Sequence, residues 1–168
     1  TIQSNITVII LSYNEENNIV SCIESTKLLT DEIHIVDMES TDKTVDLAKK
    51  NGAKVFSFPH SPYVEPSREF GIKTAKTDWV LFLDSDEEIT NHKLHVPNNK
   101  QITSYKLLRK NYFINQYIGD DKITRLIKRG AGKFVRGVHE KWVPNDLNKV
   151  GFINIPIIHN TADNLSFY

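Results

Sequence analysis

The stretch WVLFLDSDEE, residues 79–88, decides the fold class of this chain. Its five leading residues form the most apolar run in the sequence and predict a central strand buried on both faces. The run ends abruptly in acidic residues, so two carboxylates, Asp84 and Asp86, follow directly at the mouth of that strand. We therefore expect a buried sheet whose strands end in chemically active polar residues.

Upstream of this stretch, strand and helix patterns alternate. Runs of β-branched and other apolar residues predict strands at residues 6–11, 32–36 and 53–58. Apolar spacing and helix-end residues predict helices at about residues 16–28, from an N-cap at Ser40 or Thr41 to Gly52, and from Pro66 to about residue 76. Strands separated by single helices imply a parallel sheet.

After residue 90 the pattern changes. Residues 91–101 are polar and predict a loop, and extended segments without intervening helices follow at residues 102–109, 112–117, 123–128, 133–135 and 152–158. These segments predict antiparallel or mixed strands. The expected fold is therefore α/β: one three-layer α/β/α domain over residues 1–168, with a mostly parallel half (1–90) and a mixed or antiparallel half (91–168). Because the sequence stops in a segment that does not look like a finished element, we expect the second half to be truncated at its C-terminus.

Composition excludes several classes of protein. The 168 residues carry 21 basic and 21 acidic side chains, whereas a nucleic-acid binder usually has a surplus of Lys and Arg. The single cysteine, Cys22, excludes an intramolecular disulfide and favours a reducing compartment. No apolar run approaches the roughly 20 residues that cross a bilayer. These features favour a cytoplasmic location.

Polar residues follow each predicted strand of the first half. In an open parallel sheet, ligands bind beyond the carboxyl ends of the strands. By that rule, the residues expected at the ligand-binding edge are Ser12 to Glu15 after the first strand, Asp37, Glu39, Ser40 and Asp42 after the second, and Asp84 and Asp86 after the central strand. Carboxylates at one edge repel each other unless a cation or several hydrogen-bond donors offset them. These carboxylates at the strand ends therefore suit Mg²⁺ or Mn²⁺. Asp84 and Asp86 can both bind the metal, or one can bind the metal and the other a ribose hydroxyl. The alternative is an ordinary acidic loop.

Glycine-rich phosphate loops are missing from the sequence. Neither G-x-G-x-x-G nor G-x-x-x-x-G-K occurs, which argues against a dinucleotide dehydrogenase and a P-loop NTPase. Phosphate charge must then be met by the metal and by Arg68.

Four segments fall in the order and spacing typical of the family 2 glycosyltransferases, which this chain therefore resembles: residues 9–16 (IILSYNEE), 35–44 (IVDMESTDKT), 67–71 (SREFG) and 82–87 (FLDSDE). Arg125-Leu126-Ile127, Val138-His139-Glu140 and the segment from His159 to Tyr168 resemble its lipopolysaccharide-core glucosyltransferase-like subgroup. The sequence departs from the family at Met38 and Glu39, where small residues are usual, and at Glu69, where Asn is common.

The resemblance implies the GT-A fold of nucleotide-diphospho-sugar transferases and a reaction that inverts the anomeric centre. It implies that the segment Tyr13 to Glu15 and Asp37 hold the base and ribose, that Arg68 lies near the nucleotide, and that the Asp-x-Asp motif contacts ribose and metal. The candidate nucleotide-sugar residues are Ser12, Tyr13, Asn14, Glu15, Asp37, Ser40, Arg68, Asp84, Ser85 and Asp86.

A metal site and a catalytic base complete the expected chemistry. We assign Asp86 to the metal, with His139 and His159 as candidates to complete its shell or to hold an acceptor. The metal would neutralise the departing diphosphate. Glu140 is the candidate base that removes the acceptor's proton, the alternative being a surface carboxylate paired with Lys141.

Other conspicuous side chains have simpler interpretations. Trp79 and Trp142 are expected in the core, although Trp142 could stack on an acceptor sugar. Arg125 is a candidate for a diphosphate or acceptor contact. Exposed charges are expected at Arg109, Lys110, Lys128 and Arg129, and solvated histidines at His92 and His95.

The sequence thus predicts a metal-dependent inverting glycosyltransferase, a hexosyltransferase that uses a UDP-sugar and builds a cell-surface glycan or a lipopolysaccharide-type acceptor. We expect peripheral association with the inner face of a membrane. A sugar-nucleotide nucleotidyltransferase is one alternative, but it should carry a Gly-rich first loop with Arg and Lys. A non-catalytic nucleotide-binding or interaction module of the same fold is the other.

Overall fold

The computed structural model describes residues 5–90, 94, 96–97, 99–135 and 141–161. Its first half alternates strands and helices as predicted: β1 (Ile6–Ser12), α1 (Ile19–Thr26), β2 (Ile33–Asp37), α2 (Thr44–Lys50), β3 (Lys54–Ser57), α3 (Glu65–Thr74) and β4 (Trp79–Asp84). After β4 the chain consists mainly of strands: β5 (Glu87–Ile89), β6 (Ser104–Phe113), β7 (Gln116–Lys128), β8 (Gly132–Val135), β9 (Lys141–Pro144), the 3₁₀ helix η2 (Leu147–Lys149) and β10 (Val150–Asn160).

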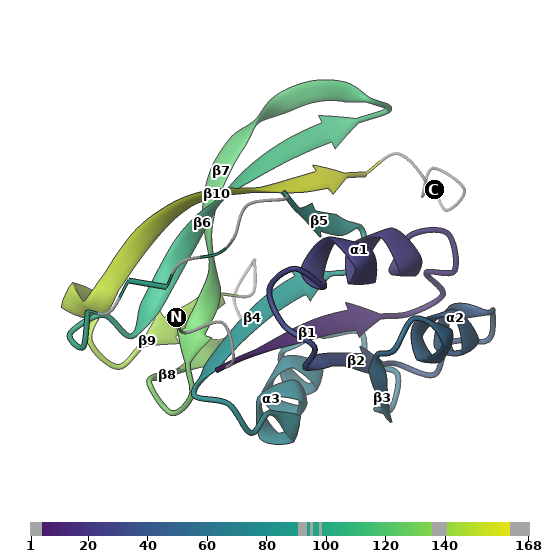
Figure 1. Ribbon diagram of the computed structural model, residues 1–168, viewed down its shortest axis with the longest axis horizontal. Coiled ribbons are helices and arrows are strands. Elements are labelled where there is room, and N and C mark those ends of the chain that lie inside the picture. Colours follow the sequence, from purple (N-terminus) through teal and green to yellow (C-terminus); the bar gives the residue numbers. More distant parts are fainter. Residues whose placement is uncertain (1–4, 91–93, 95, 98, 136–140, 162–168) are drawn as a thin grey trace.

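Eight strands form one central sheet in the order β3-β2-β1-β4-β7-β6-β10-β5, and β8 and β9 form a separate pair (Figure 1). Strands β1 to β4 pair in parallel, whereas β7 is antiparallel to both β4 and β6. The predicted α/β class, with a parallel half and a mixed half, is confirmed. The chain adds β2 and β3 on one side of β1 and β4 on the other, so the ends of β1 and β4 meet where the strand order reverses.

Alternate residues of β1 pack against opposite layers. Val8 and Ile10 belong to the core that contains α1 and α2, and Ile9 and Leu11 to the core that contains α3 and the β8–β9 pair. All four side chains are buried, which explains why the strand reads as a continuous apolar run. The structure therefore has the predicted three layers, helix–sheet–helix.

Gly71 allows α3 to approach β1 closely. A Cβ atom at this position would lie 2.8 Å from Cγ2 of Ile9. We expect Gly71→Ala to lower the free energy of unfolding by about 1–3 kcal/mol, because the added methyl group overpacks a filled core. Urea denaturation measures the change, and Lys73→Ala on the exposed side of the same helix is the control. Equal stability of the two variants would contradict the packing account.

Some boundaries differ from the prediction. The expected strand at residues 112–117 is wrong: Ile114 and Asn115 have φ angles of 46° and 58° and form the turn between β6 and β7, with Phe113 paired to Gln116. The predicted N-cap at Ser40 or Thr41 is also wrong. Helix α2 begins at Thr44. The backbone N–H of Thr44 donates to Oδ1 of Asp42 at 2.9 Å, and not to Ser40 or Thr41. The short strands β5 and β9 were not predicted.

Two apolar residues within the polar stretch 91–101 pack in the core. Leu94 and Val96 are buried, with 2% and 7% of their surfaces exposed, and both belong to the core that contains α1 and α2. Among the described helices, none combines the length and the apolar composition needed to span a bilayer.

Candidate functional site

Asp37, at the end of β2, is the centre of a hydrogen-bonded loop cluster. Its side chain is buried and accepts from Ser12 Oγ (2.9 Å), from Ser40 N (2.9 Å) and from Ser40 Oγ. The loop after β1 joins the cluster, since Asn14 N donates to Ser40 Oγ (2.9 Å) and Thr41 N donates to Asn14 Oδ1 (2.8 Å). These bonds satisfy the buried carboxylate and fix the two loops to each other. Sequence reasoning had selected Ser12, Asn14, Asp37 and Ser40 for one site, and the structure brings them together.

Tyr13 projects from this cluster. Its residue surface is 42% exposed, and its ring centroid lies 4.2 Å from that of His60 in the loop after β3. The backbone N–H of His60 donates to Oε2 of Glu39 at 3.3 Å, and Glu39 itself has a positive φ of 63°. The pair offers an aromatic surface beside Asp37, suited to stacking on a planar ring. Sequence reasoning missed His60, which no motif marks.

Asp84 ends the strand on the other side of β1 from Asp37. Asp37 is in register with Ser12 and Asp84 with Leu11, so the two residues stand at the same end of β1 with an offset of one residue. Arg68 Nη2 donates to Asp84 Oδ1 (2.8 Å) and Arg125 Nη2 to Asp84 Oδ2 (2.6 Å). Burial favours the neutral acid, but Arg125 and Arg68 outweigh it and hold the pKa of Asp84 well below its ordinary value. Asp84 is therefore a carboxylate whose charge two arginines already offset.

Glu87 extends this charge network under the site. Its surface is 0% exposed, and it accepts from Arg125 Nη2 (2.6 Å), Arg109 Nη1 (3.4 Å) and the backbone N–H of Asp84 (3.0 Å). Burial raises the pKa of Glu87, although the charge of Arg125 opposes the rise. Arg109 also donates to Asp121 Oδ2 (2.7 Å), so the expectation that Arg109 is a free exposed charge is wrong. The sequence did not predict a role for Glu87, because an acidic residue in the acidic stretch 84–88 is expected to be exposed to solvent.

Asp86 and His159, two of the predicted metal residues, lie side by side. Nε2 of His159 is 3.3 Å from Oδ2 of Asp86, and Nδ1 is 2.8 Å from Oδ1 of Asn111. The hydrogen bond to Asp86 raises the pKa of His159. Burial raises the pKa of Glu15, and the charge of Asp86 adds to that rise. The loop after β1 thus approaches Asp86 as well, and Ser85 between the two aspartates is buried.

The residues can hold a divalent cation only together with other ligands. Over the described ranges, no group of three or more His, Cys, Asp or Glu side chains is arranged to bind a metal. Asp86 and His159 supply one carboxylate and one imidazole, while Asp84 is engaged by arginines. Mg²⁺ and similar ions are commonly bound by one or two protein ligands with substrate phosphates and water, so this donor set fits a metal–diphosphate complex.

Other predicted residues have mixed outcomes. Glu140, His139, His92 and His95 lie outside the described residues, so their roles stay predictions. Trp79 and Trp142 are buried at 9% and 7% exposure and pack against Tyr105 and Phe134, which confirms their place in the core. Glu69, where the family resemblance leads one to expect Asn, accepts from the backbone N–H of Phe134 at 2.9 Å and joins α3 to β8.

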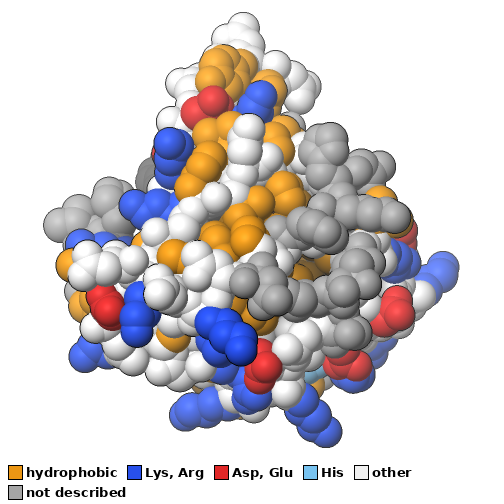
Figure 2. All heavy atoms as spheres, turned by 60° about the vertical axis from the view of Figure 1, so that its left-hand side comes forward, with side chains coloured by type: hydrophobic (Ala, Val, Ile, Leu, Met, Phe, Trp, Pro, Cys, Tyr) orange, Lys and Arg blue, Asp and Glu red, His pale blue; other side chains and the backbone are white. Residues whose placement is uncertain are grey.

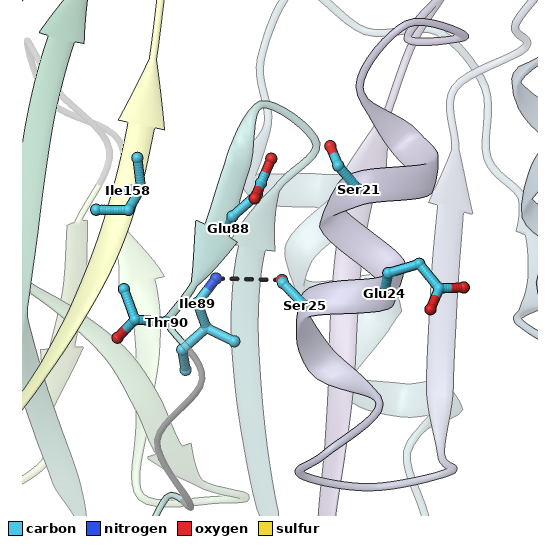
Figure 3. A pocket seen from close by; sticks show the side chains of 7 residues that line it. All are labelled: Ser21, Glu24, Ser25, Glu88, Ile89, Thr90 and Ile158. Carbon is cyan, nitrogen blue, oxygen red and sulfur yellow. Dashed lines mark hydrogen bonds between the residues drawn. The ribbon is translucent and has the colours of Figure 1, made fainter.

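A separate pocket of about 450 Å³ lies between α1 and β5 (Figure 3). It is lined by Ser21, Glu24, Ser25, Glu88, Ile89, Thr90 and Ile158, none of which is a predicted site residue. Its hydroxyls are already bonded to the backbone: Ser25 Oγ accepts from Ile89 N (3.1 Å) and donates to Cys22 O (2.7 Å), and Ser21 Oγ donates to Asn18 O (3.0 Å). We assign no ligand to this pocket.

The first half of the chain matches a known family. Residues 7–96, which contain both the Asp37 cluster and Asp84 to Asp86, match the model described as "Glycosyl transferase family 2". An uncharacterized glycosyltransferase of Rickettsia typhi is 45% identical over 85 residues, which cover 51% of this chain and 29% of that protein. The match therefore spans less than a third of the length of this relative.

Solved structures share the architecture. The glucosyl-3-phosphoglycerate synthase of Mycobacterium tuberculosis, in complex with Mn²⁺, UDP and glucosyl-3-phosphoglycerate, aligns over 93% of this chain and 72% of its own with a TM-score of 0.61 and 20% identity. A UDP complex of the same enzyme aligns over 66% and 44% of the two chains with a TM-score of 0.50 and 29% identity. The predicted GT-A fold is confirmed.

Proposed function

Because the chain belongs to glycosyltransferase family 2, we propose that it binds a nucleoside-diphosphate sugar at the ends of β1, β2 and β4 and transfers the sugar to a glycan. One observation carries the proposal: Asp37 and Asp84 end the strands on either side of β1, and Asp86, two residues beyond Asp84, lies against His159. We propose a UDP-hexose as donor, a cell-surface glycan or lipopolysaccharide-type acceptor, and inversion of the anomeric carbon. These finer assignments rest on the family resemblance.

Each part of the site has a task in this proposal. The rigid Asp37 cluster, with Ser12, Asn14 and Ser40, shapes the base and ribose pocket, and the exposed ring of Tyr13 stacks on the base. Arg68 and Arg125 fix Asp84 in its ionised form, so it accepts a hydrogen bond from a ribose hydroxyl. Arg68, which the family resemblance places near the nucleotide, lies at the same edge through its bond to Asp84.

Asp86 and His159 would hold Mn²⁺ or Mg²⁺, with His139 as a further candidate ligand. When bound, the metal would supply Lewis-acid neutralisation of the leaving diphosphate. Glu15, whose pKa is raised by burial and by Asp86, lines the approach to this pair. Glu140 is proposed to accept the proton of the acceptor hydroxyl as that oxygen attacks the face of the sugar opposite the diphosphate.

Location and domain organisation are also proposals. We propose that residues 1–90 form the donor half and residues 91–168 the acceptor half of one domain in the cytoplasm. The enzyme would act in cell-envelope glycan synthesis while associated peripherally with the inner face of a membrane. These assignments follow from the subgroup resemblance and from the single cysteine.

Glu140→Gln tests the transfer step separately from donor binding. We expect UDP-sugar affinity within about twofold of the parent and turnover lower by about 100-fold or more, because an amide cannot accept the acceptor proton. Calorimetry measures donor binding, and release of UDP measures turnover. Lys141→Gln, which alters the neighbouring charge only, is the control.

Unaltered turnover of Glu140→Gln would move the base role to another residue. Failure of the parent protein to bind any nucleoside-diphosphate sugar would remove the proposed function. Donor binding without turnover in the parent protein, across acceptors, would favour the non-catalytic alternative.

A further inference from the structure

The hairpin of β6 and β7 extends away from the helices and ends in an apolar tip, defined here as residues 112–118 (Figure 1). Four large apolar residues of this tip are exposed: Phe113 (40%), Ile114 (54%), Tyr117 (56%) and Ile118 (64%). In the space-filling view, apolar side chains gather on the projecting part of the molecule, with basic and acidic side chains beside them (Figure 2). An apolar cluster on a projecting element usually marks an interaction site.

The residue at the apex of the turn is not one that the fold requires. Ile114 has a φ of 46° and is followed by Asn115 at 58°. A two-residue hairpin turn of this type favours Asn or Gly at both positions, and a β-branched residue with positive φ is strained. The side chain of Ile114 gains little burial in return, since the residue is 54% exposed. A strained, exposed apolar residue at a hairpin apex indicates a role outside folding.

Basic residues line one face of the hairpin below the tip. Lys106, Lys110 and Tyr112 alternate along β6 and so share a face, and Lys122 joins them because it is paired with Leu108. Nζ of Lys122 lies 4.6 Å from the centre of the Phe152 ring. The tyrosines at the upper end of this face, Tyr112 and Tyr117, are in contact, with ring centroids 5.7 Å apart.

Acidic charge on the same face is smaller. Asp120 is paired with Lys110 across the strands, while Asp121 belongs to the opposite face and is bonded to Arg109. Three lysines thus accompany one carboxylate on the face that leads to the tip. The order along the hairpin is lysines, then tyrosines, then apolar side chains.

We propose that the hairpin tip inserts into the surface of an anionic lipid bilayer. Phe113, Ile114 and Ile118 would enter the boundary between headgroups and acyl chains, where apolar residues of peripheral proteins are buried. Tyrosines favour the interface itself, and lysines reach anionic headgroups with their ammonium groups.

The shape of the tip favours a lipid surface over a groove on another protein. Tyr112 and Phe113 are neighbours on β6 and therefore lie on opposite faces, and beyond the pairing of Tyr112 with Asn160 the hairpin has two strands only, so apolar side chains lie on both faces of the tip. A protein groove covers one face of such a ribbon, whereas a fluid lipid phase covers all sides. Lys106, Lys110 and Lys122 add positive charge that complements an anionic membrane in particular.

Insertion would also bring the candidate site to the membrane. Asn111, one residue before the tip, contacts His159, and Asn160 is paired with Tyr112. The distance from Asn111 to the apex at Ile114 is three residues of strand, about 10 Å. An acceptor held at the lipid surface would therefore lie near the Asp86–His159 pair.

This inference extends the peripheral membrane association of the proposed function and does not depend on donor binding. The test is co-sedimentation of the full-length protein with phosphatidylcholine vesicles, with and without phosphatidylglycerol, in the absence of nucleotide and metal. The double variant Ile114→Asn/Ile118→Thr removes apolar surface from the tip. Asn suits the positive φ at position 114 and Thr retains β-branching at 118, so the hairpin should still fold.

We expect the parent protein to bind vesicles that contain phosphatidylglycerol and the double variant to bind at least about tenfold more weakly, because two buried aliphatic side chains are lost from the lipid contact. Leu147→Ser is the matched control, since Leu147 is 78% exposed but lies in η2, away from the tip. The control should bind as the parent does, and Lys106→Gln/Lys110→Gln should weaken binding to the anionic vesicles.

Equal vesicle binding by the double variant and the parent, or no binding by the parent, would overturn the proposal. So would sedimentation equilibrium showing that the parent self-associates and the double variant does not, because the tip would then be a subunit interface. Titration of UDP with Mn²⁺ into the same samples keeps the two hypotheses apart: loss of vesicle binding with donor binding retained assigns the tip to lipid alone. Failure of the parent to bind UDP would count against the donor site and not against the tip.

Discussion

Asp86→Ala is expected to lower the affinity for UDP in the presence of Mn²⁺ by about 100-fold, the upper end of the 10- to 100-fold loss typical of groups that only support metal ligands. The physical reason is the division of labour between the two aspartates. Asp84 is held by Arg68 and Arg125, whereas His159 is the side chain that the described part of the structure places against Asp86. Asp86 is thus the carboxylate that remains to bind a cation, and calorimetry with Mn²⁺ and with a chelator measures the loss.

Asp46→Ala is a suitable control for this variant, because it removes an exposed carboxylate from α2 in the same half of the chain. It should bind UDP as the parent does. Tight binding of UDP that is independent of metal and unchanged in Asp86→Ala would remove the metal assignment.

Arg125→Leu is expected to lower the free energy of unfolding by about 3–5 kcal/mol, since it leaves buried charge without its main partner. Arg125 is 4% exposed and bridges Asp84 and the fully buried Glu87 at 2.6 Å each. Urea denaturation measures the change. Lys128→Leu removes an exposed charge from the same strand and should have a small effect.

The double variant Arg125→Leu/Glu87→Leu separates charge from packing. Removing both partners takes away the uncompensated carboxylate, so much of the lost stability should return. If the double variant were as unstable as Arg125→Leu, or if Arg125→Leu were as stable as the parent, Arg125 and Glu87 would not form the buried ion pair that the structure indicates.

The difference in free energy of unfolding between the parent and Arg125→Leu should become smaller as the pH falls. The pKa of Glu87 is raised by burial even in the parent, and without Arg125 it should rise further. A carboxyl group with a raised folded-state pKa binds a proton on folding, so it lowers stability as the pH rises above its ordinary value near 4.5. Asp84 also makes this difference smaller at low pH. Its pKa is lowered in the folded parent, so the stability that it contributes to the parent is lost as the pH falls. Denaturation series at acidic and neutral pH check the trend.

The parallel half could be predicted because its physical signals are local. Strands buried on both faces read as unbroken apolar runs, and helices between them force parallel pairing. Once the strands are known, the rule that ligands bind at their carboxyl ends places Asp37 and Asp84 at one edge, and the register with Ser12 and Leu11 confirms it. Local patterns therefore sufficed for the position of the site.

The charge balance of the site could not be predicted in this way. Sequence reasoning required a cation or hydrogen-bond donors to offset the carboxylates at the strand ends. The donors come from distant strands: Arg125 is 38 residues from Glu87, and Arg109 is 22 residues from it. Nothing in the sequence pairs these residues. The turn at Ile114 was missed for a different reason, because it lacks the Gly or Asn-Gly that usually marks a hairpin.

The most direct test of the donor site is an anomalous difference map from a crystal of the protein grown with UDP and Mn²⁺. We predict one manganese peak beside Asp86 and His159, with the diphosphate at the ends of β1 and β4 and the base against Tyr13. A peak elsewhere, or a nucleotide in the pocket between α1 and β5, would contradict the account.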